Sequence, residues 1–179
     1  MIPEQVWYNS NISFLFRFIK MNKKNVFVLI ATVVACELAG VVGSLFTAPN
    51  VDSSWYTSLV RPSLSPPNWI FGPVWTTLFA LMGVAAFLVW QSGWGRRNGK
   101  IALGVFVAQL VLNVLWSALF FGLHNPLFAF VEIIALWLAI AATIVLFYKI
   151  SRSAAWLLVP YIAWVTFAAY LNLSFWQLN

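Results

Sequence analysis

The chain has 179 residues, of which 63% are hydrophobic and 8% are charged, and its formal net charge is +6. Because soluble domains carry about 25% charged residues, this composition excludes a soluble single domain, and it equally excludes a disordered chain, a coiled coil and a collagen. What remains is an integral membrane protein small enough to form one domain.

The first 25 residues form a basic and aromatic tail ahead of the first apolar run. Residues 14–20 are compatible with a segment at the membrane interface. Met21, followed by two lysines within three residues and then an apolar run, is typical of a true translation start. A signal peptide is not expected, since the first apolar run is too long and lacks a small-residue cleavage pattern. We assign no function to this tail.

Five apolar runs follow, and each is long enough to cross a membrane. At ~1.5 Å per residue, a helix of about 20 residues spans a ~30 Å hydrocarbon core. Apart from a closed barrel, only an α-helix can cross this core, because lipid offers no hydrogen-bond partner to free backbone N–H and C=O groups. The predicted fold class is therefore an all-α membrane protein, a five-helix transmembrane bundle formed by residues 26–179. The predicted spans are 26–47, 70–91, 101–122, 127–149 and 154–176.

The one long connection lies between the first and second spans, at residues 48–69. Loops of this length are usually functional or disordered. Its aromatic residues Trp55, Tyr56 and Trp69 argue against disorder. The loop is therefore a candidate functional segment.

Lysine and arginine predict the orientation of the spans. With five spans, nine of the ten basic residues fall on one side of the membrane, and only Arg61 falls on the other. Because basic residues concentrate in cytoplasmic segments, we expect a cytoplasmic N-terminus and an external C-terminus. Topology thus explains the basic charge, and nucleic-acid binding is not expected. The nine residues are Arg17, Lys20, Lys23, Lys24, Arg96, Arg97, Lys100, Lys149 and Arg152.

Two glutamates fall inside the predicted spans, where an ionisable group costs a few kcal/mol and marks function by default. Glu37 lies near the middle of the first span. We favour a protonated packing group hydrogen-bonded to a neighbouring helix, because no embedded Lys or Arg is available to pair with it. Glu132 is either a carboxylate stabilised by the helix N-terminus or a cavity group, and the sequence leaves both readings open.

Polar and aromatic side chains inside the spans predict a cavity. Gln109, Asn113 and Trp116 share one helical face. Polar amides inside a membrane commonly form hydrogen bonds between helices, but the indole of Trp116 beside them favours a cavity wall here. Trp75 and Trp164 also lie deep in their spans. Several mid-membrane indoles with few charges suit a flat, apolar, aromatic guest. With one cysteine and one histidine in the chain, a Cys/His zinc site is excluded and no metal site is expected.

A run of aromatic and proline residues extends from the long loop into the second span, and further short motifs follow in the later spans. These are Trp55-Tyr56-x-x-Leu59-x-Arg61-Pro62-x-x-x-Pro66-Pro67-x-Trp69-x-Phe71-Gly72-Pro73-Val74-Trp75, then Leu112-Asn113-x-x-Trp116, Phe120-Phe121-Gly122, Pro160-Tyr161-x-Ala163-Trp164 and Leu171-Asn172. Together they resemble the signature of the TspO/MBR family, the tryptophan-rich sensory proteins whose animal members are the translocator protein or peripheral-type benzodiazepine receptor. The resemblance covers about residue 37 to the end.

The resemblance implies a five-helix bundle, commonly a homodimer, in which the long first loop acts as a lid over a pocket for porphyrins, other tetrapyrroles and, in some members, sterols or benzodiazepine-type drugs. No cofactor is required, since the tetrapyrrole is the ligand. The lid positions would be Trp55, Tyr56, Pro66 and Pro67, and the pocket walls Trp75, Phe79, Asn113, Trp116, Trp164, Phe167, Ala168 and Leu171.

Three functions follow as expectations. The first is a receptor or sensor in a bacterial cell membrane that binds tetrapyrroles; because His124 falls in an external turn, a metal-free porphyrin suits it at least as well as haem. The second is an enzyme that degrades porphyrin with light or oxygen, through two tryptophans that the resemblance matches to Trp75 and Trp164. The third is a porphyrin or sterol transporter, against which the lack of an inverted repeat counts. The sterol motif of animal members is interrupted here by Leu173 and Gln177.

Overall fold

The computed structural model describes residues 21–179, and within that range it contains five helical spans and no strand. The predicted five-helix bundle is confirmed, with each span beginning or ending a few residues from its predicted bounds. The predicted interfacial segment at 14–20, with Arg17 and Lys20, lies outside the described residues. The spans are α2 (Lys23–Thr47), η1 and α4 (Asn68–Ile70 and Phe71–Gly93), α5 and the π-helical turn η2 (Arg97–Ser117 and Ala118–Gly122), α6 (Pro126–Tyr148), and α7 and α8 (Arg152–Leu157 and Val159–Leu178).

Short polar side chains begin several of these helices. Asn22 accepts a hydrogen bond from the Asn25 N–H at 2.9 Å and so caps α2. Asn125 accepts from the Phe128 N–H at 3.0 Å, with Pro126 in the first turn of α6. These caps satisfy backbone donors that have no partner within the helix. The turn before α6 is tight, and His124 adopts a left-handed backbone there with φ of 53°.

Two spans depart from a regular α-helix. The fifth is divided at Leu158 into α7 and α8, and Pro160 lies in the first turn of α8. A proline has no N–H to donate and its ring crowds the preceding turn, so the helix is interrupted there. The third span ends in the π-helical turn η2, which carries Phe120 and Phe121 inside the bundle.

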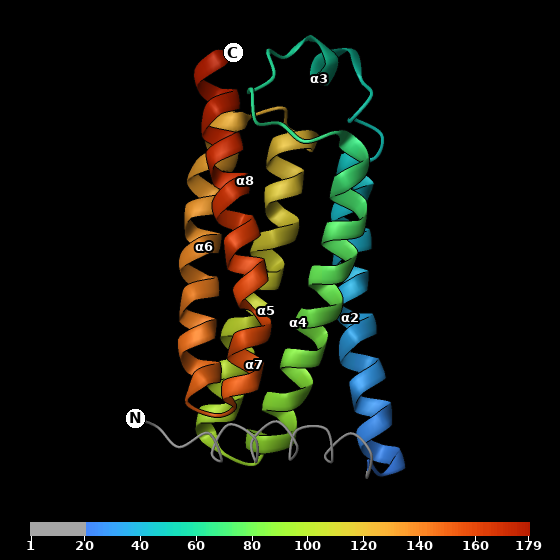
Figure 1. Ribbon diagram of the computed structural model, residues 1–179, viewed down its shortest axis with the longest axis vertical. Helices are drawn as coiled ribbons and strands as arrows, with labels where there is room; N and C mark the ends of the chain where they lie inside the picture. The colour runs from blue at the N-terminus through green and yellow to red at the C-terminus, as the bar shows by residue number, and fades with distance from the viewer. Residues whose placement is uncertain (1–20) are drawn as a thin grey trace, which may run out of the picture.

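Helices α2 and α4 lie side by side (Figure 1) and approach closely at glycines. A Cβ placed on Gly83 would lie 2.5 Å from the Cα of Val33. A Cβ on Gly40 would lie 2.5 Å from the ring of Phe79. Glycine at these two positions therefore permits the close approach of α2 and α4, as expected for small residues in membrane helices.

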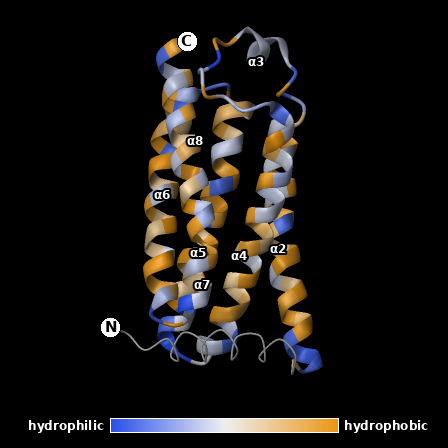
Figure 2. Ribbon diagram, in the orientation of Figure 1, coloured by the Kyte–Doolittle hydropathy of each residue, from blue (hydrophilic) through white to orange (hydrophobic). Residues whose placement is uncertain are grey.

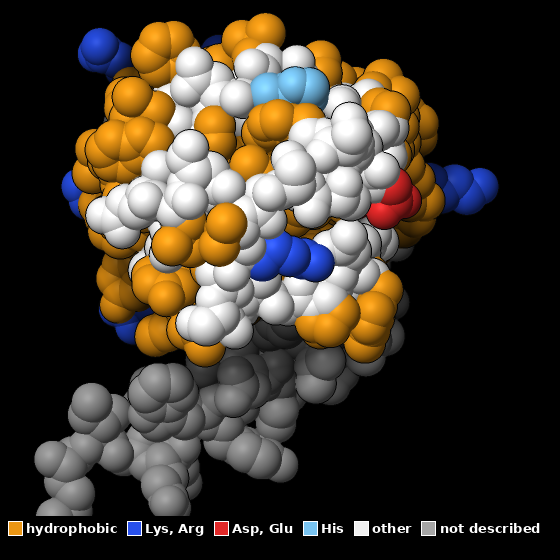
Figure 3. Space-filling view, turned by 90° about the horizontal axis from the view of Figure 1, so that it is seen from above, with side chains coloured by type: hydrophobic (Ala, Val, Ile, Leu, Met, Phe, Trp, Pro, Cys, Tyr) orange, Lys and Arg blue, Asp and Glu red, His pale blue; other side chains and the backbone are white. Residues whose placement is uncertain are grey.

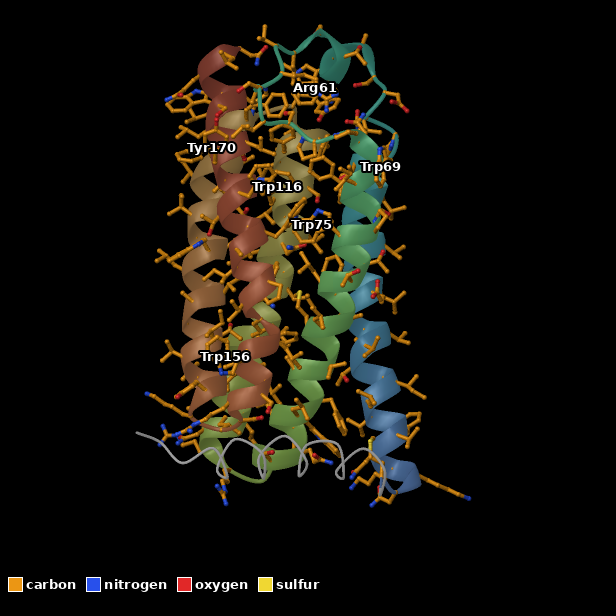
Figure 4. The ribbon with its side chains drawn as sticks, viewed as in Figure 1. Arg61, Trp69, Trp75, Trp116, Trp156 and Tyr170 are labelled. Carbon is orange, nitrogen blue, oxygen red and sulfur yellow. The ribbon has the colours of Figure 1, made fainter. Side chains whose placement is uncertain are left out.

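The hydrophobic core occupies the middle and lower part of the bundle, where residues such as Met82, Ile140 and Val165 are fully buried. Apolar residues also cover the outer sides of the helices, whereas polar residues gather at the two ends (Figure 2). The α4–α5 and α6–α7 connections and the start of α2 lie at one end of the bundle, and Arg61 lies at the other (Figures 1 and 4). This distribution fits a multi-pass membrane protein.

Candidate ligand-binding cavity

A cavity of about 520 Å³ lies in the half of the bundle beneath the long loop. Helices α2, α4, α5 and α8 supply its walls, and its lining is mostly apolar. Small-molecule sites commonly occupy about 300–1,000 Å³ with an apolar lining and few polar groups. The lining residues are Glu37, Gly40, Val41, Gly43, Ser44, Thr47, Ala48, Val51, Tyr56, Asn68, Phe71, Gly72, Trp75, Thr76, Phe79, Asn113, Trp116, Ser117, Phe120, Phe121, Trp164, Ala168, Leu171, Asn172 and Phe175.

The long loop closes the end of this cavity with one aromatic side chain. Its short helix α3 (Ser54–Ser58) holds Tyr56, which is only 7% exposed. The ring of Tyr56 lies 5.6 Å from that of Phe121 and 6.0 Å from that of Phe175, measured between centroids. The loop therefore covers the cavity as a lid.

Hydrogen bonds at two places hold the lid down. The Val60 N–H donates to Asn179 Oδ1 at 2.8 Å, and Asn179 Nδ2 donates to the Val60 carbonyl at 3.3 Å. Asn50 Oδ1 lies 3.2 Å from His124 Nε2 in the turn before α6. The loop is thus attached to the C-terminus of α8 and to the α5–α6 turn.

Arg61 is the basic residue of the lid. Its guanidinium lies 5.7 Å from the Tyr56 ring centroid and donates to Asn68 Oδ1 at 2.7 Å. Burial raises the pKa of Tyr56 above its ordinary value, and the neighbouring Arg61 acts in the opposite direction. Seen from above, this end of the molecule carries mostly uncharged side chains (Figure 3). Arg61 therefore supplies a positive charge beside the covered end of the cavity.

Trp75 and Trp164 border the cavity from opposite helices, α4 and α8. The Trp75 ring lies 5.6 Å from Phe79 and 6.3 Å from Tyr161, and the Trp164 ring lies 5.8 Å from Phe71. Nε1 of Trp164 is buried without a hydrogen-bond partner among residues 21–179. Trp75 and Trp116 lie at similar heights in the upper half of the bundle (Figure 4). The cavity therefore presents aromatic surfaces from two sides.

A buried chain of hydrogen bonds supports the α5 wall. Asn113 Nδ2 donates to the Tyr161 hydroxyl at 3.0 Å, and that hydroxyl donates to Gln109 Oε1 at 2.9 Å. The indole N–H of Trp116 donates to Asn172 Oδ1 at 2.9 Å. The predicted polar face of α5 thus serves both purposes: Asn113 and Trp116 border the cavity and also join α5 to α8, whereas Gln109 only joins the helices.

The two intramembrane glutamates have different surroundings. Glu37 is half-buried and borders the cavity, where it is the only charged lining residue. The hydrogen bond to a neighbouring helix that we expected for it does not form within the described part of the chain. Glu132 is 8% exposed, is the seventh residue of α6 and does not border the cavity. It therefore lies in the second turn of α6, and of the two readings only the cavity group is contradicted.

The structure brings eight of the twelve predicted site residues to the cavity: Tyr56, Trp75, Phe79, Asn113, Trp116, Trp164, Ala168 and Leu171. The other four do not border it. Trp55 stacks on His124 with 4.2 Å between centroids, and Phe167 lies against Trp164. Pro66 and Pro67 precede η1 in the covering loop, where Pro67 is exposed.

The α2 wall is the part of the site that the sequence-based prediction missed. Glu37, Gly40 and Ser44 border the cavity from this helix. The available signal was a stripe of small and polar residues ending near Ser44, in a span otherwise rich in valine and leucine. No group of three or more His, Cys, Asp or Glu side chains in residues 21–179 lies close enough to hold a metal ion.

Comparison with known proteins gives one family. A model of the TspO/MBR family matches residues 32–177. The chain is 45% identical over 159 residues to the tryptophan-rich protein TspO of Chlorobaculum tepidum, covering 89% of this chain and 99% of the relative. It is 44% identical over 156 residues to the protein of the same name from Archaeoglobus fulgidus, covering 87% and 99%. The human translocator protein is 41% identical over 126 residues, covering 70% of this chain and 75% of its own length.

Proposed function

The chain belongs to the TspO/MBR family, and from that premise we propose that it is a membrane receptor or sensor that binds tetrapyrroles of the protoporphyrin type in its aromatic cavity. Other flat apolar molecules are further candidate ligands. The observation that carries the proposal is the cavity of about 520 Å³, walled by Trp75, Trp116 and Trp164 and covered by Tyr56.

Burial of an apolar ring system supplies the affinity in this proposal. Each Å² of apolar surface removed from water contributes roughly 25 cal/mol, and aromatic rings add offset or edge contacts with the guest. A flat macrocycle lying against the aromatic side chains of α4 and α8 would gain both the burial of apolar surface and the ring contacts. Sensing then means that the bound and free forms of the protein differ in a way that a partner can detect.

Polar groups at the cavity fix the orientation of the ligand. Because Asn113 Nδ2 is engaged by Tyr161, the Oδ1 atom is the part of this amide available to accept from a ligand. Among the described residues, the cavity lining contains no His, Cys or Met side chain, the side chains that most often ligate haem iron, so no axial ligand favours a metalloporphyrin. Arg61, beside Tyr56, supplies a positive charge for a carboxylate on the ligand. The residues therefore suit a metal-free, carboxylate-bearing macrocycle.

Titration in the dark tests the binding. Purified protein is titrated with protoporphyrin IX while tryptophan fluorescence is recorded, and we expect saturable quenching. Trp75→Ala removes a cavity wall and should weaken binding by about tenfold, the effect of about 1.4 kcal/mol. Trp156→Phe is the control, because Trp156 is 66% exposed and does not border the cavity. Quenching that does not saturate would remove the tetrapyrrole proposal.

Light-dependent porphyrin degradation is the second candidate function. Trp75 and Trp164 border the same cavity, and Trp164 Nε1 has no hydrogen-bond partner within residues 21–179. An indole can donate one electron to a photoexcited macrocycle and recover it after dioxygen has added to the ring, so that the net reaction is oxidation of the macrocycle by dioxygen. Illumination of the complex should then bleach the porphyrin bands, and Trp75→Phe and Trp164→Phe should abolish bleaching while dark binding persists. An unchanged spectrum under light favours the receptor.

Transport of a porphyrin or sterol is the remaining alternative. Glu37 borders the cavity and Glu132 does not, so coupling to protons would depend on Glu37. Glu37→Gln separates the functions, because transport into vesicles should fail in this variant while ligand binding and photochemistry persist. Equal uptake by the wild type and by Glu37→Gln would mean that Glu37 takes no part in coupling transport to protons.

We further propose that the protein lies in a bacterial cell membrane as a homodimer, with the N-terminal end of α2 facing the cytoplasm. The basic residues at the end opposite Arg61 support this orientation. Gly95 and Ser63 are exposed in connections at opposite ends of the bundle. An impermeant maleimide added to whole cells should label Ser63→Cys and not Gly95→Cys. The reverse pattern would invert the orientation.

A further inference from the structure

The cavity is closed on the side of α8. Phe71 and Trp164 meet edge to face at 5.8 Å between centroids, and Trp75 and Tyr161 meet at 6.3 Å. These two contacts join α4 to α8 across the cavity wall. None of the α8 residues that line the cavity is exposed. Aromatic side chains therefore cover the cavity between α4 and α8.

The α5 side and the lid are closed as well. A Cβ on Gly43 of α2 would lie 3.3 Å from Ser117 Oγ, and one on Gly122 would lie 3.1 Å from the ring of Phe46. Tyr56 fills the end under the lid, and opening that lid would break the hydrogen bonds between Asn179 and Val60. Passage by that route requires the loop to move.

The exposed lining residues lie along a single line, the seam between the upper halves of α2 and α4. Below the seam the two helices touch, at Gly40 with Phe79 and at Gly83 with Val33. Above these contacts nothing lies within 4 Å of a Cβ built on Gly72. The exposed lining residues are Val41, Ser44 and Ala48 on α2, Gly72 and Thr76 on α4, and Asn68 just before α4.

The chemistry of the seam suits an apolar ligand. Ser44 Oγ donates to the Val41 carbonyl at 2.7 Å, and Thr76 Oγ1 donates to the Gly72 carbonyl at 3.1 Å. Both hydroxyl protons are therefore engaged within their own helices, so an apolar molecule passing them breaks no hydrogen bond. Val41, at 54% exposure, contributes an apolar surface. The side chains along the seam therefore do not oppose the passage of an apolar ligand by requiring a hydrogen bond to be broken.

We propose that the seam between α2 and α4 is a lateral portal through which an apolar ligand passes between the lipid and the cavity. The inference rests on the proposed function, since it concerns the route taken by the same ligand. A flat apolar macrocycle partitions into the membrane, where its concentration beside the seam exceeds its concentration in water. Entry through the portal leaves the lid in place.

Neighbouring threonines provide a matched test. Thr76 and Thr77 are both exposed on α4 and both donate to the carbonyl four residues earlier, but only Thr76 borders the cavity. Stopped-flow mixing of proteoliposomes with vesicles that carry protoporphyrin IX gives the rates of binding and release. Thr76→Phe narrows the portal, so both rates should fall by about tenfold, the pattern expected of a gate. Thr77→Phe should leave both rates unchanged.

Ser44→Phe narrows the portal from the α2 side and should slow both rates in the same way. If the wild type shows no saturable binding, the proposed function fails and the portal fails with it. If the wild type binds and the phenylalanine variants exchange ligand at wild-type rates, the portal alone is wrong. A slower association with unchanged release would mean that the new side chain occupies the cavity, and it also overturns the portal. Faster exchange in Asn179→Ala, with no effect of Thr76→Phe, would assign the route to the lid.

Discussion

Tyr161 is the residue on which the α5 wall of the cavity depends most. It is fully buried, and its hydroxyl both accepts from Asn113 and donates to Gln109. A hydroxyl in this position fixes which atom of the Asn113 amide can reach a ligand. The hydrophobic effect alone would not set that orientation, because it is non-directional.

Tyr161→Phe should therefore lower both stability and affinity. Removal of the hydroxyl leaves Asn113 and Gln109 with unpaired buried groups, at a cost of about 1–3 kcal/mol. Thermal unfolding in detergent measures the stability, and fluorescence quenching by protoporphyrin IX measures the affinity. Tyr170→Phe is the matched control, since Tyr170 is exposed and lies on the same helix. Equal effects of the two substitutions would contradict a special role for Tyr161.

The sequence indicated which side chains border the cavity where a side chain's neighbours are set by its own helix. Asn113 and Trp116 lie one turn apart on α5, and helical periodicity alone brings both to the cavity. Trp55 lies in the covering loop, where its motif assigned it, but its ring stacks on His124 of a different connection and does not border the cavity. Contacts between two loops have no periodic signal in the sequence, so this position could not be derived.

At the scale of the elements, the approach of α2 to α4 controls the shape of the cavity. Gly83 permits it, because a Cβ there would lie 2.5 Å from Val33 Cα and 2.9 Å from its N atom. Backbone atoms cannot yield as a flexible side chain does. The two helices would have to separate to accept any larger residue at this position.

Gly83→Ala should destabilise the bundle by about 1–3 kcal/mol, the usual cost of overpacking. Gly104→Ala should not destabilise it, because nothing lies within 4 Å of a Cβ at Gly104 and alanine favours the helix. Thermal unfolding of both variants in one detergent makes the comparison. Equal melting temperatures would contradict the close contact between α2 and α4.

The lid gives a second prediction at this scale. Tyr56→Ala removes the ring that lies against Phe121 and Phe175, so ligand release should become several-fold faster as the covered end of the cavity opens. Ser54→Ala is the control, because Ser54 is exposed on the same short helix. The dissociation rate in the dark measures the effect. A rate unchanged in Tyr56→Ala would mean that the lid does not retain the ligand.

Hydropathy predicted the five spans well because lipid allows only long apolar helices. The division of the fifth span at Leu158 also has a sequence signal, in Pro160. The π-helical turn at Ala118–Gly122 has none, although it carries Phe120 and Phe121 to the lid. The α2 wall was missed because its lining residues are small, and only packing against α4 and α5 shows which face of α2 turns inward.

At the scale of the whole molecule, the packed core and the cavity proposed as the ligand site occupy different halves of the bundle. The middle and lower part is filled by core side chains such as Phe87 and Ile140, and the part near the lid is hollow. A membrane protein gains little from burying apolar side chains away from lipid, so a hollow region costs less than it would in water. Four of the five spans contribute a wall, and the lid covers them.

A cavity-filling substitution tests the central claim, that this hollow region is the ligand site, most directly. Ala168 lines the cavity, whereas Ala142 is exposed on the outer side of α6. Dark titrations with protoporphyrin IX compare Ala168→Phe and Ala142→Phe with the wild type, with thermal unfolding to verify that each is folded. We predict saturable quenching in the wild type and in Ala142→Phe, and its loss in folded Ala168→Phe. Equal saturable quenching in all three proteins would place the ligand elsewhere and contradict the assignment of the cavity.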